Sequence, residues 1–146
     1  MLKNQSLTIA AILIAGVFGL FLFFDPLGVS LDVPSHVSVT HTVLFQFSKD
    51  ASPDAIQEAC GRMIALKDAC VNPSTQKPYI VSLRGGKDNS AEGKQGGATH
   101  GFVVEFASTA DRDYYIQHDP AHQTFVQSAS DIVQNAIVVD FENGLF

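Results

Sequence analysis

The stretch VSVTHTVLFQF, residues 37–47, carries the clearest structural signal in this chain. Apolar residues and one histidine occupy every second position, and mainly polar residues fill the positions between them. Such alternation is typical of a strand with one buried face. We therefore predict a half-buried strand over residues 37–47, whose apolar face consists of Val37, Val39, His41, Val43, Phe45 and Phe47.

Capping residues predict two helical regions downstream of this strand. Ser52-Pro53-Asp54 supplies an N-cap, a proline suited to the first turn and an acid that complements the helix dipole. Asn72-Pro73 ends this first helix. Ser108 and Asp111 form a capping box for a second helix, and Asp119-Pro120 starts a further short one.

Three more strands are predicted over residues 79–84, 99–106 and 132–141, with a flexible glycine-rich connection over residues 85–97. The resulting order, β-α-β-β-α-β, predicts an α+β fold of the ferredoxin-like type, an antiparallel four-stranded sheet with helices on one face. The other face of the sheet also carries large apolar residues. A second copy packed against that face would bury them, so we expect a homodimer.

The N-terminal residues 1–24 form a separate hydrophobic segment, followed by a linker over residues 25–36 and the domain over residues 37–146. Leu7 to Phe24 contains no charge and as a helix would span ~27 Å, close to the bilayer core. Lys3 before it favours a single-pass transmembrane anchor with a cytosolic N-terminus. The alternative is a signal peptide cleaved near Gly28-Val29-Ser30, which would make the protein secreted.

The charge balance argues against nucleic-acid partners. The chain has 15 acidic and nine basic residues and a formal net charge of -6, and an acidic surface repels phosphate backbones. No histidines or cysteines have the spacing of a metal site or redox motif. We therefore expect neither a metal nor another cofactor, and we expect Cys60 and Cys70 to be reduced.

Four segments resemble one known family: VTHTVLFQF (39–47), GATHGFVVEF (97–106), DYYIQHDPAH (113–122) and VVDF (138–141). In this order they are similar to the stress-responsive dimeric α/β-barrel family. The resemblance implies two ferredoxin-like subunits whose sheets pack into a barrel-like dimer. The family includes non-enzymatic stress-associated plant proteins and a polyketide cyclase, olivetolic acid cyclase, which closes a linear polyketide by aldol condensation.

The resemblance also implies site residues. A tyrosine and a histidine form the acid/base pair of the cyclase, and they match Tyr115 and His122. Further histidines of the family pocket match His41 and His100. The cyclase pattern histidine-proline-alanine-histidine is altered here to His118-Asp119-Pro120-Ala121-His122, which lengthens the spacing between the tyrosine and the second histidine by one residue.

Two functions are consistent with these residues. The first is a membrane-tethered dimeric enzyme of secondary metabolism, a cofactor-independent cyclase or lyase acting on a hydrophobic carbonyl compound. His122 would be its base, because histidine titrates near pH ~6.5, and Tyr115 its hydrogen-bonding partner. We expect the substrate pocket to be lined by His41, Val43, Phe45, His100, Phe102 and Val104. The second is a non-catalytic stress-response or ligand-binding dimer, in which these side chains belong to the core or bind a ligand without turnover.

Overall fold

A four-stranded antiparallel sheet is the centre of the fold in the computed structural model, which describes residues 38–146. The strand order is β2-β3-β1-β4, and each neighbouring pair runs antiparallel. The elements along the chain are β1 (Val39–Phe47), α2 (Pro53–Ala69), β2 (Ile80–Lys87), β3 (His100–Phe106), α3 (Thr109–Gln117), α4 (Pro120–Ala129) and β4 (Val133–Glu142). This order and topology confirm the predicted ferredoxin-like β-α-β-β-α-β fold.

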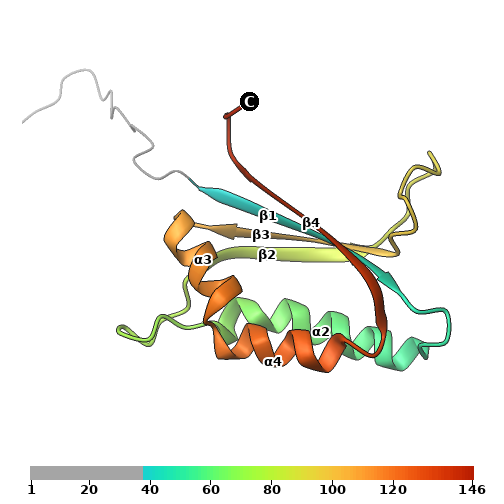
Figure 1. The fold of residues 1–146 in the computed structure, drawn as a ribbon, viewed down its shortest axis with the longest axis horizontal. Coiled ribbons are helices and arrows are strands. Elements are labelled where there is room, and N and C mark those ends of the chain that lie inside the picture. Colours follow the sequence, from blue (N-terminus) through green and yellow to red (C-terminus); the bar gives the residue numbers. More distant parts are fainter. Residues whose placement is uncertain (1–37) are drawn as a thin grey trace, which may run out of the picture. The chain divides into compact units, whose positions relative to one another are not determined.

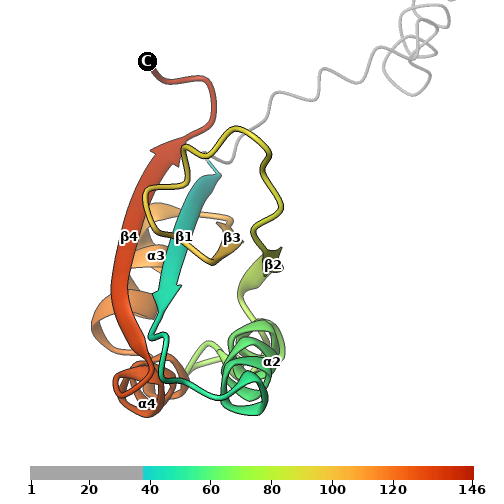
Figure 2. The same cartoon turned by 90° about the vertical axis from the view of Figure 1, so that its right-hand side faces the viewer.

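Within residues 38–146, all helices lie on one face of the sheet. In Figures 1 and 2, α2 and α4 lie side by side beneath the strands, and α3 lies at one end of them. The alternation in β1 explains this arrangement, because every second residue from Val39 to Phe47 is buried. These side chains meet buried residues of β3 and the helices in one core, which includes Ala59, Met63, Leu66, Phe102, Val104, Phe106, Tyr115 and Phe125.

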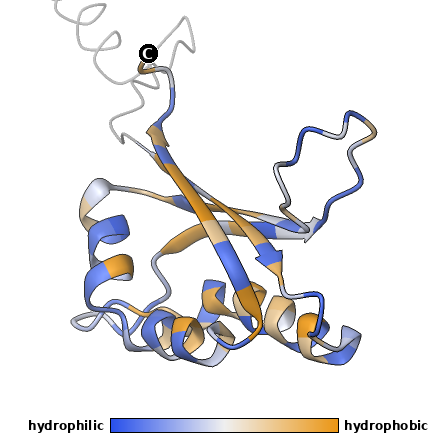
Figure 3. Ribbon diagram, turned by 45° about the vertical axis from the view of Figure 1, so that its right-hand side comes forward, coloured by the Kyte–Doolittle hydropathy of each residue, from blue (hydrophilic) through white to orange (hydrophobic). Residues whose placement is uncertain are grey.

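The opposite face of the sheet is apolar and open to solvent in the single chain. Strand register places Ile137 of β4 beside Leu44 and Val139 beside Thr42, so these side chains point away from the helices. The exposed fractions of Ile137, Val139 and Phe141 are 42%, 54% and 47%. Figure 3 shows the hydrophobic colour of β4 and, by contrast, the hydrophilic loop between β2 and β3. A monomer would therefore expose an apolar strip along this face.

Strand β2 is longer than the sequence predicted. It continues through Lys87, and Gly85 and Gly86 pair with Phe102 and Gly101 of β3. A Cβ at Gly85 would collide with the Phe102 ring and the Gly101 carbonyl. Gly85 thus allows close packing within the sheet, and the prediction of a loop from residue 85 was wrong for its first three residues.

The predicted N-caps are confirmed at all three helix starts. Ser52 Oγ accepts a hydrogen bond from Ala55 N at 3.2 Å, and Ser108 Oγ accepts one from Asp111 N at 3.1 Å. Asp119 caps α4 from a buried position, with an exposed fraction of 1%. Its Oδ1 accepts from the backbone nitrogens of residues 121 and 122 at 2.8 and 3.0 Å, and its Oδ2 accepts from Tyr79 Oη at 2.7 Å.

The predicted N-terminal anchor or signal segment lies outside the described residues. Within residues 38–146, no helix has the length and apolarity that crossing a bilayer requires. The cysteines in this part are both free, and Cys70 caps the C-terminal end of α2 rather than lying inside the helix.

Replacing Asp119 with alanine should destabilise the domain by ~2–4 kcal/mol, because it leaves two helix N–H groups and the Tyr79 hydroxyl without their buried acceptor. Urea unfolding followed by circular dichroism measures this change. Ser52→Ala, which removes an exposed cap, is the matched control and should cost only ~1 kcal/mol. Equal losses in the two variants would show that the Asp119 cluster adds nothing beyond an ordinary cap.

Candidate active site

A cavity of ≈ 690 Å³ lies between the helix-facing side of β1 and β4 and the helices α3 and α4. Strand β1 contributes His41, Val43 and Phe45, and the helices contribute Tyr115 and His122. The remaining lining is mostly apolar and consists of Met63, Ile116, Phe125, Val126, Ala129, Ser130, Val133, Gln134, Asn135, Ala136 and Val138. The mostly apolar lining suits a hydrophobic ligand.

Three polar aromatic rings line this cavity. The His122 ring stacks on the Tyr115 ring, with centroids 3.8 Å apart and planes 29° apart. The His41 ring meets the same tyrosine edge-on at 5.7 Å. The structure thus brings together Tyr115 and His122, despite the additional residue between them, and places His41 edge-on against the same tyrosine.

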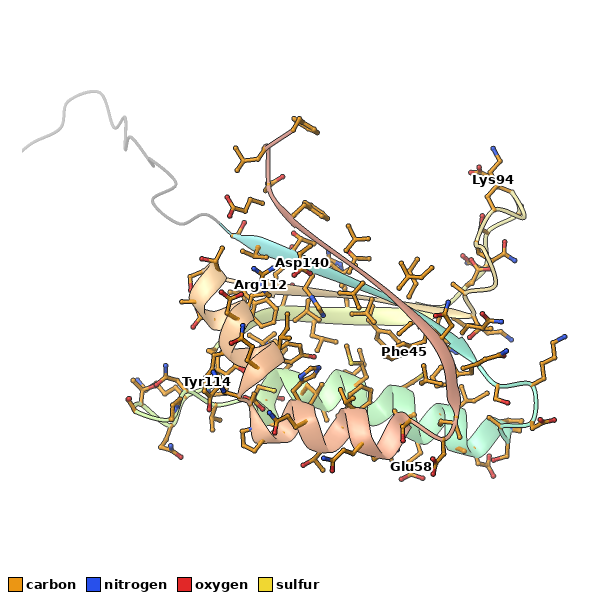
Figure 4. The ribbon with its side chains drawn as sticks, viewed as in Figure 1. Phe45, Glu58, Lys94, Arg112, Tyr114 and Asp140 are labelled. Atoms are coloured by element: carbon orange, nitrogen blue, oxygen red, sulfur yellow. The ribbon has the colours of Figure 1, made fainter. Side chains whose placement is uncertain are left out.

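Asp140 of β4 holds His41 from the neighbouring strand. The two residues are paired in the sheet, and Asp140 Oδ1 lies 2.6 Å from His41 Nδ1. Arg112 of α3 binds the other carboxylate oxygen of Asp140, and its Nε donates to Asp113 Oδ1 at 2.7 Å. Figure 4 shows Arg112 and Asp140 next to each other between α3 and the sheet.

This contact determines which ring nitrogen of His41 carries the proton. A neutral imidazole donates from one nitrogen and accepts at the other. The carboxylate can only accept a hydrogen bond, so Nδ1 of His41 must be the donor. The proton of a neutral His41 therefore lies on Nδ1, and the lone pair lies on Nε2. The ring itself is 4% exposed and lines the cavity, so His41 is both oriented and adjacent to any bound ligand.

Burial keeps His122 in its neutral form. Desolvation lowers the pKa of His122 below its ordinary value, and the positive form of His41 lowers it further. The Tyr115 backbone and the Asp119 carboxylate act in the opposite direction. Among residues 38–146, the Nδ1 atom of His122 is buried without a hydrogen-bond partner. A neutral imidazole that lines a cavity is suited to exchange a proton with a ligand.

Tyr115 is a proton donor in this environment. Its side chain is 0% exposed, and burial raises the pKa of Tyr115 well above its ordinary value, with the Cys70 thiol and the Asp119 carboxylate acting in the same direction. The phenol therefore stays protonated near neutral pH. It can donate a hydrogen bond to a negatively charged oxygen, but it cannot act as a base.

The structure does not bring the other predicted pocket residues to this cavity. His100 and Phe102 line a separate cavity, and Val104 is fully buried in the core. The His100 ring instead packs edge-on against Phe47 at 5.0 Å, and its Nδ1 lies 3.1 Å from Thr99 Oγ1. The physical reason is a wall of aromatic rings, in which Phe45 and Phe102 contact each other with centroids 5.4 Å apart.

Sequence reasoning missed Arg112 and Asp140. Asp140 alternates with Ala136 and Val138 on the helix-facing side of β4, as the register with β1 shows. A carboxylate at an inward position of an apolar strand requires a buried partner, and this signal could have pointed to His41. Within residues 38–146, no group of three histidine, cysteine or acidic side chains could hold a metal ion.

Comparisons with known proteins agree with this architecture. A model of the stress responsive A/B barrel domain matches residues 39–143. Among solved structures, the chain is similar to the Arabidopsis thaliana protein At3g17210, with 28% identity, a TM-score of 0.63, and coverage of 74% of this chain and 97% of the plant protein. A comparison with curated proteins gave no match.

Two further solved structures share the fold. One is a dimeric ferredoxin-like protein from Jannaschia, with 26% identity, a TM-score of 0.57, and coverage of 72% of this chain and 98% of the other. The other is a hydroxynitrile lyase from Passiflora edulis, with 20% identity, a TM-score of 0.62, and coverage of 75% and 96%. The chain is thus similar to proteins that are dimeric and to one that is an enzyme.

His122 should titrate below pH 6.5, its ordinary value, in a histidine-selective NMR titration. Because its folded pKa lies below its unfolded pKa, its contribution to stability is complete above pH ~6.5 and is lost as the pH falls. The free energy of unfolding should therefore fall less between about pH 7.5 and about pH 5 in His122→Gln than in the wild type. An unchanged pH dependence would contradict the burial of a neutral ring.

Proposed function

Because the chain belongs to the stress responsive A/B barrel domain family, we propose that its cavity catalyses cofactor-independent proton transfer on a small hydrophobic carbonyl compound. The observation that carries this proposal is the stack of His122 on Tyr115, two residues that line a mostly apolar cavity together with His41. This arrangement combines a neutral base, a proton donor and a hydrophobic environment.

In this mechanism His122 acts as the base. It removes the proton from a carbon next to a carbonyl group, and the electron pair of that C–H bond forms an enolate. Attack of the enolate carbon on a second carbonyl group of the same molecule closes a ring and produces an alkoxide. His122 then returns its proton to the alkoxide, so the atoms and charges balance without a cofactor. The reaction is an aldol cyclisation, as in the polyketide cyclase that the sequence resembles.

Tyr115 and His41 support this proton transfer. The protonated phenol of Tyr115 can donate to the enolate oxygen, where negative charge develops. His41 is held by Asp140 at 2.6 Å and presents Nε2 as an acceptor for a substrate hydroxyl group. We therefore regard Tyr115 and His122 as catalytic residues, His41 as a substrate-binding residue and Asp140 as the residue that positions His41.

A lyase reaction is the second form of the same chemistry. The likeness to the hydroxynitrile lyase from Passiflora edulis shows the fold alone, but it makes a hydroxynitrile a suitable second test substrate. A base in the same position would take the hydroxyl proton, and the carbon–carbon bond to the nitrile would break to release cyanide and an aldehyde or ketone. Both reactions need one base and no cofactor.

The alternative is a non-catalytic dimer that binds a small hydrophobic ligand or serves a stress response. The complete burial of Tyr115 and the largely apolar lining suit this role too, because they allow a ligand to be held without reaction. The two functions differ in one observable: a carrier binds its ligand and releases it unchanged.

Incubation of the full chain with a linear polyketide thioester and with an aromatic hydroxynitrile tests the enzyme proposal. His122→Ala should lower kcat/KM for the active substrate by ~10²–10⁴-fold, because it removes the base. Tyr115→Phe should mainly lower kcat. Product is measured by chromatography, with His118→Ala as the control because His118 is exposed and lies outside the cavity lining. Identical product formation in His122→Ala and the wild type would refute the catalytic role.

Asp140→Asn tests the positioning of His41. The amide keeps the size of the side chain, but it can donate a hydrogen bond to His41 Nδ1, whereas the carboxylate only accepts one from it. The proton of the neutral His41 ring can therefore move to Nε2. We expect KM to rise more than kcat falls, because substrate binding loses its acceptor. A change in stability alone, with both kinetic constants intact, would leave Asp140 as a purely structural residue.

We also propose that the protein is a homodimer joined through the open face of the sheet. The apolar strip formed by Ile137, Val139 and Phe141 supports this assembly, as do the dimeric relatives. If the predicted anchor over Leu7–Phe24 is retained, the dimer would be tethered to a membrane, where hydrophobic substrates concentrate.

Val139→Asp should convert the dimer into a monomer, because two symmetry-related carboxylates would be buried without partners. Light scattering after size-exclusion chromatography of the full chain measures the mass. Ile64→Glu is the control, because it introduces one charge at a comparable exposed position of 40% on α2. Dissociation in the control, or a dimer that survives Val139→Asp, would exclude the sheet face as the interface.

A further inference from the structure

A second cavity of ≈ 890 Å³ lies between the first half of α2 and the paired strands β2 and β3. It shares no lining residue with the cavity of His41 and His122, and Phe45 and Phe102 separate the two. We propose that this second cavity is a binding site for a hydrophobic carboxylate, such as a fatty acid. It contains two residues that the sequence assigned to a substrate pocket, His100 and Phe102.

The floor of the second cavity is hydrophobic. Ile56, Cys60 and Ile64 follow one another at intervals of four along α2 and form a stripe beside the buried core residues of that helix. Phe47 and Phe102 complete the floor from the sheet. The Phe102 ring lies over Gly85, where any side chain would collide with it. This close packing fixes one wall of the cavity at the sheet.

Gly61 keeps the opposite wall open. It lies in the middle of α2 and lines the cavity, although glycine destabilises a helix interior relative to alanine. A Cβ at this position would meet no atom within 4 Å, so no packing constraint within the described residues requires glycine there. A larger side chain would extend into the open space of the cavity. A side chain at Gly61 would therefore occupy this space without disturbing the packing of the fold.

The charges around the cavity are positive. They come from Lys49 and Lys87, and none of the lining residues is acidic, although the chain as a whole has a net charge of -6. His100 also lines the cavity, but burial and the neighbouring Lys87 lower the pKa of His100 and favour its neutral form. Neither lysine forms a salt bridge within residues 38–146. Asp50 and Asp88 are next to these lysines in sequence but do not line the cavity. The site therefore favours an anionic group above a hydrophobic floor.

A carboxylate with an alkyl chain matches both features. The carboxylate can pair with the lysines, and the alkyl chain can lie along the stripe of α2. The cavity volume falls within the range of ~300–1,000 Å³ that is typical of small-molecule sites. Each additional buried methylene group should tighten binding roughly fourfold until the floor is covered. Lys49 and Lys87 would repel a cationic amphiphile of the same length.

Photo-labelling of the full chain tests this proposal directly. The probe is a dodecanoate analogue with a diazirine in its chain, and the protein is kept in a sterol-based detergent that has no alkyl tail to compete. After irradiation, tryptic mass spectrometry should find adducts in the segments 47–64 and 85–102. Excess dodecanoate should abolish labelling, and dodecyltrimethylammonium should not. Adducts concentrated over residues 115–138, or equal competition by the cation, would overturn the proposal.

Variants separate binding from folding. Gly61→Leu should abolish labelling, because the leucine side chain fills the cavity. The melting temperature of this variant should be at least that of the wild type, because leucine favours a helix more than glycine does. Lys87→Gln should weaken competition by dodecanoate about fivefold. Lys77→Gln is the matched control, because Lys77 is exposed in the turn before β2 and should change nothing. Undiminished labelling in Gly61→Leu would overturn the proposal whatever the activity of the other cavity.

Discussion

The burial of one face of β1 is the constraint on which the rest of the structure depends. β1 is a central strand and pairs with both β3 and β4. Its helix-facing side chains form the middle of the core, and they include one polar residue, His41. A buried imidazole needs a hydrogen-bonding partner, and β4 supplies Asp140 at the paired position. The same requirement that completes the core thus places an oriented histidine at the edge of a cavity.

A buried carboxylate holds the start of the helix that carries His122. Asp119 caps α4, binds the Tyr79 hydroxyl and fixes the backbone at His122. This residue lengthens the spacing relative to the cyclase that the sequence resembles, and in the structure it caps a helix. The break between α3 and α4 accommodates the longer spacing, so the rings of Tyr115 and His122 still stack at 3.8 Å. The Asp119 cap at the start of α4 therefore keeps Tyr115 and His122 in contact, although the spacing between them is one residue longer.

Much of the fold could be predicted from local signals, because alternation and capping depend on neighbouring residues. The predictions failed where the outcome depends on strand register. Gly85 was interpreted as part of a loop, whereas Phe102 on β3 makes it a strand residue. His100 was assigned to the pocket of His41, but the contact between Phe45 and Phe102 divides the space beneath the sheet. The link from Arg112 through Asp140 to His41 joins distant segments, and only the folded chain reveals it.

His41 and His122 face one ligand cavity, while His100 faces another. Histidine-selective ¹⁵N NMR of the full chain, titrated with 4-butylphenol as a stable mimic of a hydrophobic enol, tests this claim most directly. We predict that the signals of His41 and His122 shift together with one binding curve, that His100 does not respond, and that free His41 carries its proton on Nδ1. Shifts confined to His100, or a response of His122 without His41, would contradict this assignment of the three histidines to two cavities.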